Sequence, residues 1–299
     1  MARLLLTGAT GFIGAAVLRR LVAEGHEVIA LHGGRNAPAE TVGVDWHAFD
    51  LLDAAPDGIA GLVARSGATH CLHAAWYTNH ADYLTAPINR DWIEGSLRLA
   101  AAFRAGGGAR FIALGTCLEY DASGAAPLSE AATPLRPETL YARCKAELWA
   151  RLCEASGGEA GLAWARVFFV YGPGDRAGRL FPWLLDNLAR GAPVAAHFGG
   201  ARRDYVHVDD LAAQLCRIAL SPLEGAVNAG TGEAASIADI FRLAGELTGR
   251  EELVTINDRT ESGGPDLIEA DMARYRSLVG PVETRSLCDG LSGLIEARR

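Results

Sequence analysis

The chain has 299 residues, of which 49% are hydrophobic and 21% are charged, and its formal net charge is −8. This composition is that of a globular protein with one large domain or two closely joined ones. The negative charge argues against nucleic acid or an acidic membrane surface as the main partner. The six cysteines form no CxxC pair and are too sparse for a disulfide scaffold, so we expect reduced thiols in a cytoplasmic protein. The apolar run Leu4–Leu6 is too short for a signal peptide or a membrane span, so no membrane partner is expected.

Short apolar runs alternate with helix-like stretches through the first half of the chain. This alternation is typical of βαβ units, and it predicts an α/β protein with a doubly wound parallel Rossmann sheet. The first predicted strand is Arg3–Thr7, followed by a helix over Ile13–Glu24 and a strand over Glu27–Leu31. Later predicted strands are Val44–Phe49, His70–His73, Arg110–Leu114 and Leu162–Phe168, and later helices are Trp92–Arg104 and Tyr141–Glu154.

After about residue 171, glycine and proline separate shorter elements, and the sequence pattern changes again after residue 232. We therefore predict a smaller, interleaved C-terminal region that supplies substrate contacts. In this division residues 1–168 and 204–230 form the dinucleotide-binding domain, and residues 169–203 and 231–299 form the substrate-binding region.

A glycine-rich loop joins the first predicted strand to the first predicted helix. Glycines at positions 8, 11 and 14 lack β-carbons where a backbone would have to turn and approach a pyrophosphate closely. The helix that follows would offer unpaired amides and a positive dipole to the phosphates. The strand–loop–helix context favours a dinucleotide site over a structural turn. The predicted contacts are Gly8, Thr10, Gly11, Phe12, Ile13 and Gly14.

The end of the second predicted strand bears on the choice of dinucleotide. NAD-preferring Rossmann proteins usually carry Asp or Glu there to bind the ribose hydroxyls. The matching residue is His32, and Arg35 follows in the loop, where it could pair with a ribose phosphate or remain a solvated charge. We therefore favour NADP(H), with NAD(H) possible.

Tyr141 and Lys145 stand at positions i and i+4 of a predicted helix, so their side chains share one helix face. A fixed cation stabilises a phenolate and lowers the pKa of the phenol, which would make Tyr141 a usable acid and base. A surface pair on a helix is the alternative interpretation. We predict a catalytic pair because it follows the fifth predicted strand at a suitable distance.

Several stretches resemble the extended short-chain dehydrogenase/reductase family. Residues 7–14 read TGATGFIG, which matches the family's typical loop throughout and has GxxGxxG spacing rather than GxGxxG. Residues 166–173, 203–210 and 228–232 resemble the family's R-x-x-N-x-Y-G-P, RDYxHVDD and NxGxG patterns. The resemblance covers nearly the whole chain and implies an NAD(P)-dependent nucleotide-sugar epimerase, dehydratase or ketoreductase that forms a homodimer.

The resemblance also implies roles for individual residues. Thr116 would hydrogen-bond the substrate oxygen while Tyr141 handles the proton, and Lys145 would also hold the nicotinamide ribose. Arg203 would contact the substrate diphosphate, or else form a salt bridge between the two regions. Further cofactor contacts would be Asp50 and Leu51 near the adenine and Ala74 and Ala75 along the dinucleotide. The substrate-binding candidates are Trp76, Thr116, Cys117, Phe169, Arg179 and Arg203.

The sequence departs from the family at two substrate-contacting positions. Phe169 replaces the asparagine of the R-x-x-N segment, and Trp92 replaces an asparagine that usually precedes a Gly-Thr pair. The substrate contacts therefore differ from those of a standard UDP-galactose epimerase. Trp76, Tyr77 and Trp92 either shape the pocket instead or are simply core aromatics.

Accessory residues restrict the reaction type. The 4,6-dehydratases resemble one another in a Thr-Asp-Glu run, whereas Thr116 is followed by Cys117 and Leu118, so a dehydratase is disfavoured. GDP-fucose synthases carry a reactive cysteine at the place of Leu118, and Cys117 is better explained as a packed thiol. A 4-ketoreductase that uses NADPH is favoured over an NAD-retaining 4-epimerase, and a dinucleotide sensor without turnover is a third interpretation. No metal is predicted, because His70 and His73 would face opposite sides of a strand.

Overall fold

The computed structural model describes residues 2–33, 41–124, 126–260 and 265–298. The strands are β1 Arg3–Thr7, β2 Glu27–His32, β3 Val44–Ala48, β4 His70–His73, β5 Arg110–Thr116, β6 Leu162–Val167, β7 Phe169–Tyr171, β8 Val194–Ala196, β9 Arg202–His207, β10 Gly225–Ala229, β11 Ala234–Ser236, β12 Val254–Ile256 and β13 Leu267–Ile268. The α-helices are α1 Phe12–Ala23, α2 Pro56–Ser66, α3 Asn89–Ala105, α4 Leu140–Ser156, α5 Leu180–Ala189, α6 Val208–Leu220, α7 Ile237–Thr248, α8 Ala273–Leu278 and α9 Leu287–Glu296, and short 3₁₀ turns are η1 Cys117–Glu119 and η2 Glu251–Leu253.

A seven-stranded parallel sheet forms the larger part of the molecule, in the order β10-β6-β5-β4-β1-β2-β3. The chain runs outward from β1 through β2 to β3, then returns to β4 on the other side of β1 and continues through β5 and β6. The order therefore reverses between β1 and β4, and in open α/β sheets ligands bind at such a switch point, beyond the carboxyl ends of the strands. This topology confirms the predicted doubly wound parallel Rossmann sheet.

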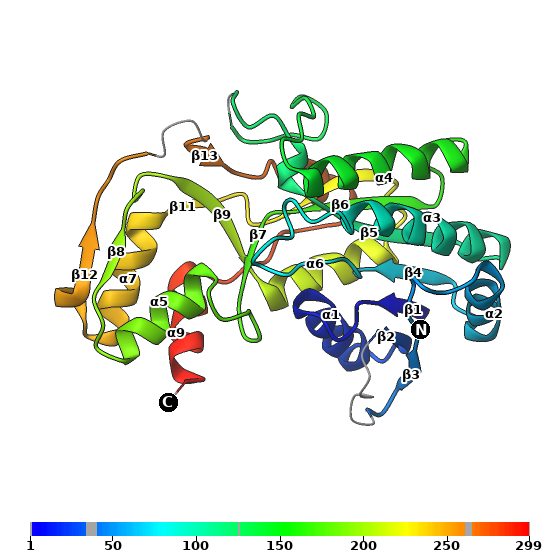
Figure 1. Cartoon of the computed structure of the whole chain (residues 1–299), viewed down its shortest axis with the longest axis horizontal. Coiled ribbons are helices and arrows are strands. Elements are labelled where there is room, and N and C mark those ends of the chain that lie inside the picture. Colours follow the sequence, from blue (N-terminus) through cyan, green and yellow to red (C-terminus); the bar gives the residue numbers. More distant parts are fainter. Residues whose placement is uncertain (1, 34–40, 125, 261–264, 299) are drawn as a thin grey trace.

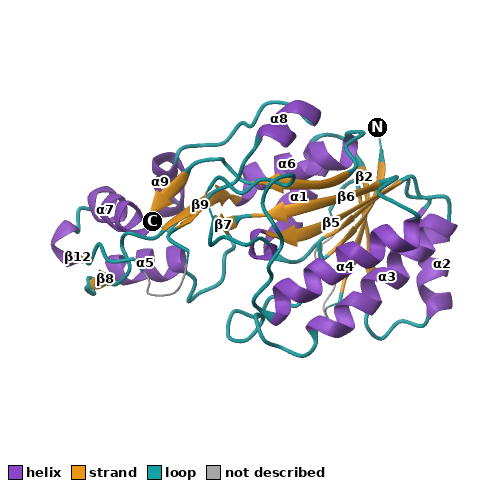
Figure 2. Cartoon of the chain, turned by 90° about the horizontal axis from the view of Figure 1, so that it is seen from above, coloured by secondary structure: helices purple, strands orange, loops and turns teal. Residues whose placement is uncertain are grey.

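Helices cover both faces of this sheet (Figures 1 and 2), with α1 and α6 on one face and α2, α3 and α4 on the other. Because both faces are covered, the central strands are apolar almost throughout, as parallel strands usually are. Residues Leu4–Leu6 of β1, for example, have no exposed surface. Their side chains alternate between the two buried clusters, which fixes the register of the strand.

A smaller region lies at the other end of the molecule (Figure 1), built from a sheet of β7, β9, β11 and β13 and a parallel pair, β8 with β12. Helices α5, α7 and α9 pack there on a separate buried cluster that includes Phe181 and Phe241. This arrangement confirms the predicted smaller C-terminal region. It is interleaved in sequence, because β10 lies between β9 and β11 in the chain but pairs with β6 in the large sheet.

The strands predicted over Arg3–Thr7 and His70–His73 have the predicted bounds, whereas β5 runs two residues beyond the predicted Arg110–Leu114. The extension reflects the neighbouring strand, since Gly115 and Thr116 pair with β6. That pairing places Thr116 at the carboxyl end of the sheet. In the part of the chain that the structure describes, no helix combines the length and the apolar character that a membrane crossing requires.

Candidate active site

The glycine loop packs closely against the backbone that follows β4 and against the first turn of α1. Gly8 has φ +69°, and a β-carbon there would lie 2.7 Å from the backbone nitrogen of Ala75. A β-carbon on Gly14 would lie 2.0 Å from the carbonyl oxygen of Gly8. Gly11 caps α1 without a side-chain hydrogen bond, so no side chain of the cap competes for the first amides of the helix. The loop therefore has the close backbone approach and the open helix N-terminus that a pyrophosphate needs.

A chain of hydrogen bonds with defined donors and acceptors joins β1, β4 and α3 at the switch point. Ser96 donates its only hydrogen to the carbonyl of Trp92 at 2.6 Å, so it accepts from Nε2 of His73 at 2.8 Å. Nδ1 of His73 then accepts from the Thr7 hydroxyl at 2.7 Å, and Thr7 accepts from the amide of Ala75 at 3.1 Å. Burial, with a smaller contribution from the Lys145 charge, lowers the pKa of His73 to about 3. The imidazole is therefore a neutral link between β1, β4 and α3.

Replacing Thr7 with valine is expected to lower the free energy of unfolding by about 2 kcal/mol, because Nδ1 of His73 loses its partner in a buried place. In a protein of this size that corresponds to a melting temperature about 3 °C lower. The same substitution at Thr255, which is exposed on β12, is the matched control and should change stability little. Equal melting temperatures for the two variants would contradict the assigned network.

A cavity of about 380 Å³ opens beside the glycine loop. Its lining brings together six of the predicted site residues, which are Gly8, Thr10, Asp50, Leu51, Ala75 and Trp76. Tyr77, Thr78, Asn79 and Arg176 also line it, and the sequence patterns did not identify them as cofactor contacts. Arg176 comes from the C-terminal region and reaches the cavity by donating to the carbonyl of Thr78 at 2.7 Å.

The remaining predicted cofactor residues lie around this cavity or outside the described chain. Phe12, Ile13 and Gly14 form the first turn of α1, and Ala74 packs against Gly8. His32 ends β2, with its ring at an edge-on 6.1 Å from Trp46. Within the described residues its buried Nδ1 has no hydrogen-bond partner. Arg35 lies outside the described residues.

Thr116, Tyr141 and Lys145 come together where β5 meets α4. The Thr116 side chain lies near enough to the Tyr141 phenol to lower its pKa, and Lys145 lies one helical turn along α4, with Nζ 5.8 Å from the centre of the Tyr141 ring. The expectation that the phenol has a lowered pKa is wrong for this structure. Burial raises the pKa of Tyr141, and the effect of Thr116 offsets only part of that rise. Burial also lowers the pKa of Lys145 to about 7, so the cation is only partly charged at neutral pH.

Lys145 is the only lysine in the chain, and every other residue in its Lys+Arg total of 28 is arginine. Arginine replaces lysine readily at solvated positions, but its guanidinium stays protonated and cannot titrate near neutrality. The single lysine at the fifth position of Y-x-x-x-K is therefore a signal in the sequence that points to this helix face.

Glu119 fixes the backbone of Thr116 through a hydrogen bond to its amide. Its Oε1 accepts from the Thr116 amide at 2.8 Å, its Oε2 accepts from Nε of Arg166 at 2.9 Å, and both oxygens accept from the Trp164 indole at 3.1 Å. Glu119 has no exposed surface, and Arg166 is 4% exposed. Burial raises the pKa of Glu119, and Arg166 opposes that rise. Sequence patterns missed this pair because its partners are 47 residues apart and meet only through the pairing of β5 with β6.

The predicted substrate residues divide between the two regions. Cys117 is buried next to Thr116, and burial raises the pKa of its thiol, which supports a packed rather than a reactive cysteine. Phe169 lies on β7, with the Arg203 guanidinium 6.0 Å from its ring centre. Arg203 donates to the carbonyls of Arg202 and Asp266 at 2.9 and 3.4 Å, which lends no support to the salt-bridge alternative. Arg179 pairs with Asp175 at 3.2 Å.

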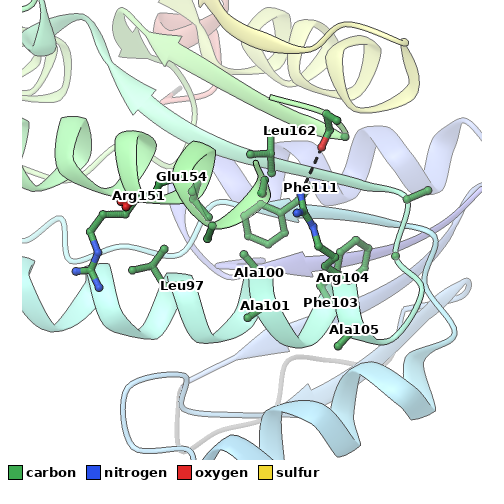
Figure 3. Close-up of a pocket in the computed structure, with 17 residues that line it drawn as sticks. Leu97, Ala100, Ala101, Phe103, Arg104, Ala105, Phe111, Arg151, Glu154 and Leu162 are labelled. Atoms are coloured by element: carbon green, nitrogen blue, oxygen red, sulfur yellow. Dashed lines mark hydrogen bonds between the residues drawn. The ribbon is translucent and has the colours of Figure 1, made fainter. Parts of the chain in front are cut away.

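A larger cavity, of about 710 Å³, lies between α3 and α4 (Figure 3). Its walls include Ala100, Phe103 and Leu162, and Arg104 donates across it to the carbonyl of Ala160 at 3.4 Å. No predicted site residue lines it. Size alone therefore does not locate the candidate active site in this molecule.

The two histidines of β4 have different surroundings, as a strand geometry predicts. His70 lies near the surface beside the Thr69 hydroxyl, whereas His73 is buried in the network described above. Among the described residues, no cluster of three or more His, Cys, Asp or Glu side chains could hold a metal ion.

Comparisons with known proteins agree with this geometry. Residues 4–230 match the model of the NAD dependent epimerase/dehydratase family. The chain is 29% identical to a dTDP-6-deoxy-L-talose 4-dehydrogenase (NAD(P)(+)) of Kitasatospora kifunensis, over 99% of this chain and 96% of that protein. It is 27% identical to a UDP-glucose 4-epimerase of Azospirillum brasilense, over 97% and 89% of the two chains.

Solved structures share the whole fold. A NAD-dependent NDP-hexosamine 5,6-dehydratase of tunicamycin biosynthesis, TunA, superimposes with a TM-score of 0.83 at 26% identity and covers 100% of this chain and 99% of its own. The UDP-glucose 4-epimerase of Thermotoga maritima gives the same TM-score at 21% identity, with 99% and 98% coverage. With its glycine loop, its parallel sheet and a family match over most of its length, this chain belongs to the NAD-dependent epimerase/dehydratase family of nucleotide-sugar enzymes.

Proposed function

We propose that this protein reduces the C4 carbonyl of a nucleotide-linked 4-keto-6-deoxy sugar, with NADP(H) as the favoured dinucleotide. The observation that carries the proposal is the grouping of Thr116, Tyr141 and Lys145 where β5 meets α4, with Lys145 one turn from Tyr141. The similarity to a dTDP-6-deoxy-L-talose 4-dehydrogenase over nearly the full length supports the C4 chemistry and the 6-deoxy sugar class.

The glycine loop fits a dinucleotide, because a β-carbon at Gly8 or Gly14 would fill the space where the backbone must come close. The amides at the start of α1 would bind the pyrophosphate, and the cavity beside Asp50 and Leu51 would take the adenosine half. The bound dinucleotide would supply the hydride to the sugar carbon. His32 stands where NAD-preferring proteins carry a carboxylate, and the lack of that carboxylate supports NADP(H). The further contact proposed for Arg35 rests on the sequence alone.

The chain's own residues would handle the proton. Tyr141 would donate its phenolic hydrogen to the sugar oxygen as the hydride arrives at C4, which leaves a phenolate at Tyr141. Thr116 would donate a hydrogen bond to the same oxygen and orient it. The charged form of Lys145 would stabilise the phenolate until solvent returns a proton. Arg179 and Arg203 would contact the diphosphate, and Trp76, Cys117 and Phe169 would border the sugar.

An NAD-retaining 4-epimerase is the second candidate, because curated relatives at similar identity include UDP-glucose 4-epimerases. Tyr141 would then take the proton of the C4 hydroxyl while the bound dinucleotide takes the hydride from C4, and the hydride would return to the opposite face of C4 as Tyr141 returns the proton to the oxygen. The homodimer, the cytoplasmic location and the division into residues 1–168 with 204–230 and 169–203 with 231–299 remain part of the proposal.

The two candidates differ in what happens to the dinucleotide. We expect purified protein to release little NAD on denaturation and to consume added NADPH when mixed with a panel of nucleotide-linked 4-keto-6-deoxy sugars. Loss of absorbance at 340 nm measures the reaction directly. Turnover of a nucleotide sugar without added dinucleotide, together with NAD released from the denatured protein, would establish the epimerase instead. Binding without chemical change would indicate a sensor and contradict both.

A further inference from the structure

Trp76 is held in one orientation by a fully buried amide. Both hydrogens on Nδ2 of Asn89 are engaged, by the carbonyls of Tyr83 and Ala86 at 2.7 and 2.8 Å. Its Oδ1 is therefore left to accept from Nε1 of Trp76, at 2.7 Å. Trp92 stacks on the same indole, with ring centres 5.9 Å apart and planes at 29°. The indole plane is thus fixed by a hydrogen bond and a stacked neighbour.

The face of that indole covers the Lys145 ammonium. Nζ of Lys145 lies 3.7 Å from the centre of a Trp76 ring and donates to the carbonyl of Leu114 at 2.7 Å. The residue is only 4% exposed, so water can satisfy little of a group that carries three hydrogens. A tryptophan face is the most favourable aromatic partner for a cation, and its effect grows when the cation is desolvated.

The groups around Lys145 leave its charge finely balanced. From η1, Glu119 favours the charged form, although Arg166 neutralises much of that carboxylate. From β4, His73 is neutral, and from α4 itself the Tyr141 ring centre lies 5.8 Å from Nζ. Burial opposes the charge and brings the pKa of Lys145 to about 7. A single favourable contact can therefore decide whether the ammonium persists at neutral pH.

We propose that Trp76 is a positioning residue for Lys145, whose ring face holds the ammonium in place and in its charged form. Asn89 acts one step further back, by fixing the plane of the ring. This inference deepens the proposed function, since it rests on Lys145 serving Tyr141, but the contact itself can be tested without any turnover.

Because the chain has a single lysine, a lysine-specific probe reports on Lys145 alone. Protein labelled with ¹³C at the lysine ε-carbon shows one lysine side-chain signal, and its titration reports Lys145 alone. The wild-type signal should titrate near neutral pH and carry the upfield displacement of a nucleus over an indole face. In Trp76→Leu we expect the displacement to vanish and the midpoint to fall by about one pH unit. In Trp76→Phe, which keeps a smaller ring face, the midpoint should lie between the two.

The matched control is Trp183→Leu, at a tryptophan on α5 that is 40% exposed and remote from Lys145. Its lysine signal should be that of the wild type. An unchanged or raised midpoint in Trp76→Leu overturns the proposal. If Trp76→Leu does not fold, Trp76→Phe provides the test, because a wild-type midpoint in that variant also contradicts the proposal.

Kinetics separate this inference from the proposed function. Above the lysine's midpoint, one pH unit is a tenfold change in the charged fraction, so kcat of Trp76→Leu at pH 8 should fall about tenfold, with Trp76→Phe restoring most of it. The KM for the sugar is expected to rise in Trp76→Leu as well, because Trp76 borders the sugar in the proposed site, so the lysine titration and the pH dependence of kcat carry the test. A shifted lysine signal in a protein that never transfers hydride would defeat the proposed function and leave the Trp76 contact established. Hydride transfer by the wild type, together with an unshifted lysine signal in Trp76→Leu, would overturn the Trp76 contact and leave the proposed function standing.

Discussion

Replacing Tyr141 with phenylalanine is expected to lower kcat about 10³-fold, because the proton that neutralises the new alkoxide would have no donor in a buried place. The ring is kept, so its edge contacts with Tyr83 and Trp76 should persist. Dinucleotide affinity and the melting temperature should therefore change little. The measurement is steady-state consumption of NADPH with the sugar that the wild type accepts, alongside a dinucleotide titration followed by fluorescence.

The matched control for loss of a buried phenol is Tyr275→Phe, in α8, which packs in the large core and is no part of the candidate site. It should retain wild-type kcat. If Tyr141→Phe keeps more than about a tenth of the wild-type kcat, Tyr141 is not the proton donor, since general acid catalysis by a positioned side chain contributes at least 10²-fold. A rate that recovers at low pH would instead point to solvent as the acid.

Replacing Gly14 with alanine is expected to weaken dinucleotide binding at least about 100-fold and to lower the free energy of unfolding by about 3 kcal/mol. The added β-carbon would stand 2.0 Å from the carbonyl oxygen of Gly8 and 2.7 Å from its carbon, and both are backbone atoms that cannot rotate away. Helix α1 must then move off the loop, and its amides move with it. Isothermal titration with NADPH and thermal melting measure the two effects.

Gly58 provides the control, because it is also a helical glycine but nothing lies within 4 Å of a β-carbon placed there. Gly58→Ala should bind dinucleotide normally and melt no lower than the wild type. If Gly14→Ala is too unstable to purify, Gly11→Ala serves in its place. Gly11 has φ −78°, which alanine adopts freely, and its nearest obstacle is the Gly8 carbonyl at 3.2 Å. We expect that variant to fold and to bind at least about tenfold more weakly; normal binding would show that the loop holds no phosphate.

Prediction from sequence was most accurate where a local pattern determines the structure. The apolar run of β1, the glycine loop and the start of α1 follow one another without any contribution from distant residues; β1 has the predicted bounds and α1 begins one residue before its predicted start. The pair of Tyr141 and Lys145 is equally local, because four residues make one helical turn. Helix α2 was not predicted, since glycines at 58 and 61 weaken its helical pattern and only a narrow face is buried.

Electrostatic expectations failed for a different reason. The sequence places a cation one turn from Tyr141 and so suggests a lowered pKa for the phenol, but burial has the larger effect and raises it. Burial depends on Tyr83 and Trp76, in the segment between β4 and α3, which meets α4 only in the folded molecule. The same holds for Lys145, whose charge depends on an indole 69 residues earlier in the chain.

The sequence by itself determined that the chain folds as a doubly wound sheet, where a phosphate-binding loop can form and which helix face carries the phenol and the only lysine. Each of these follows from periodicity or from residues within one turn of each other. Only the tertiary structure decided how Thr116 is held, through Glu119 and Arg166, and how Lys145 keeps its charge, beneath Trp76. Those contacts join strands, a turn and helices distant in the chain, and the free energy of a buried charge depends on every group that replaces its lost water.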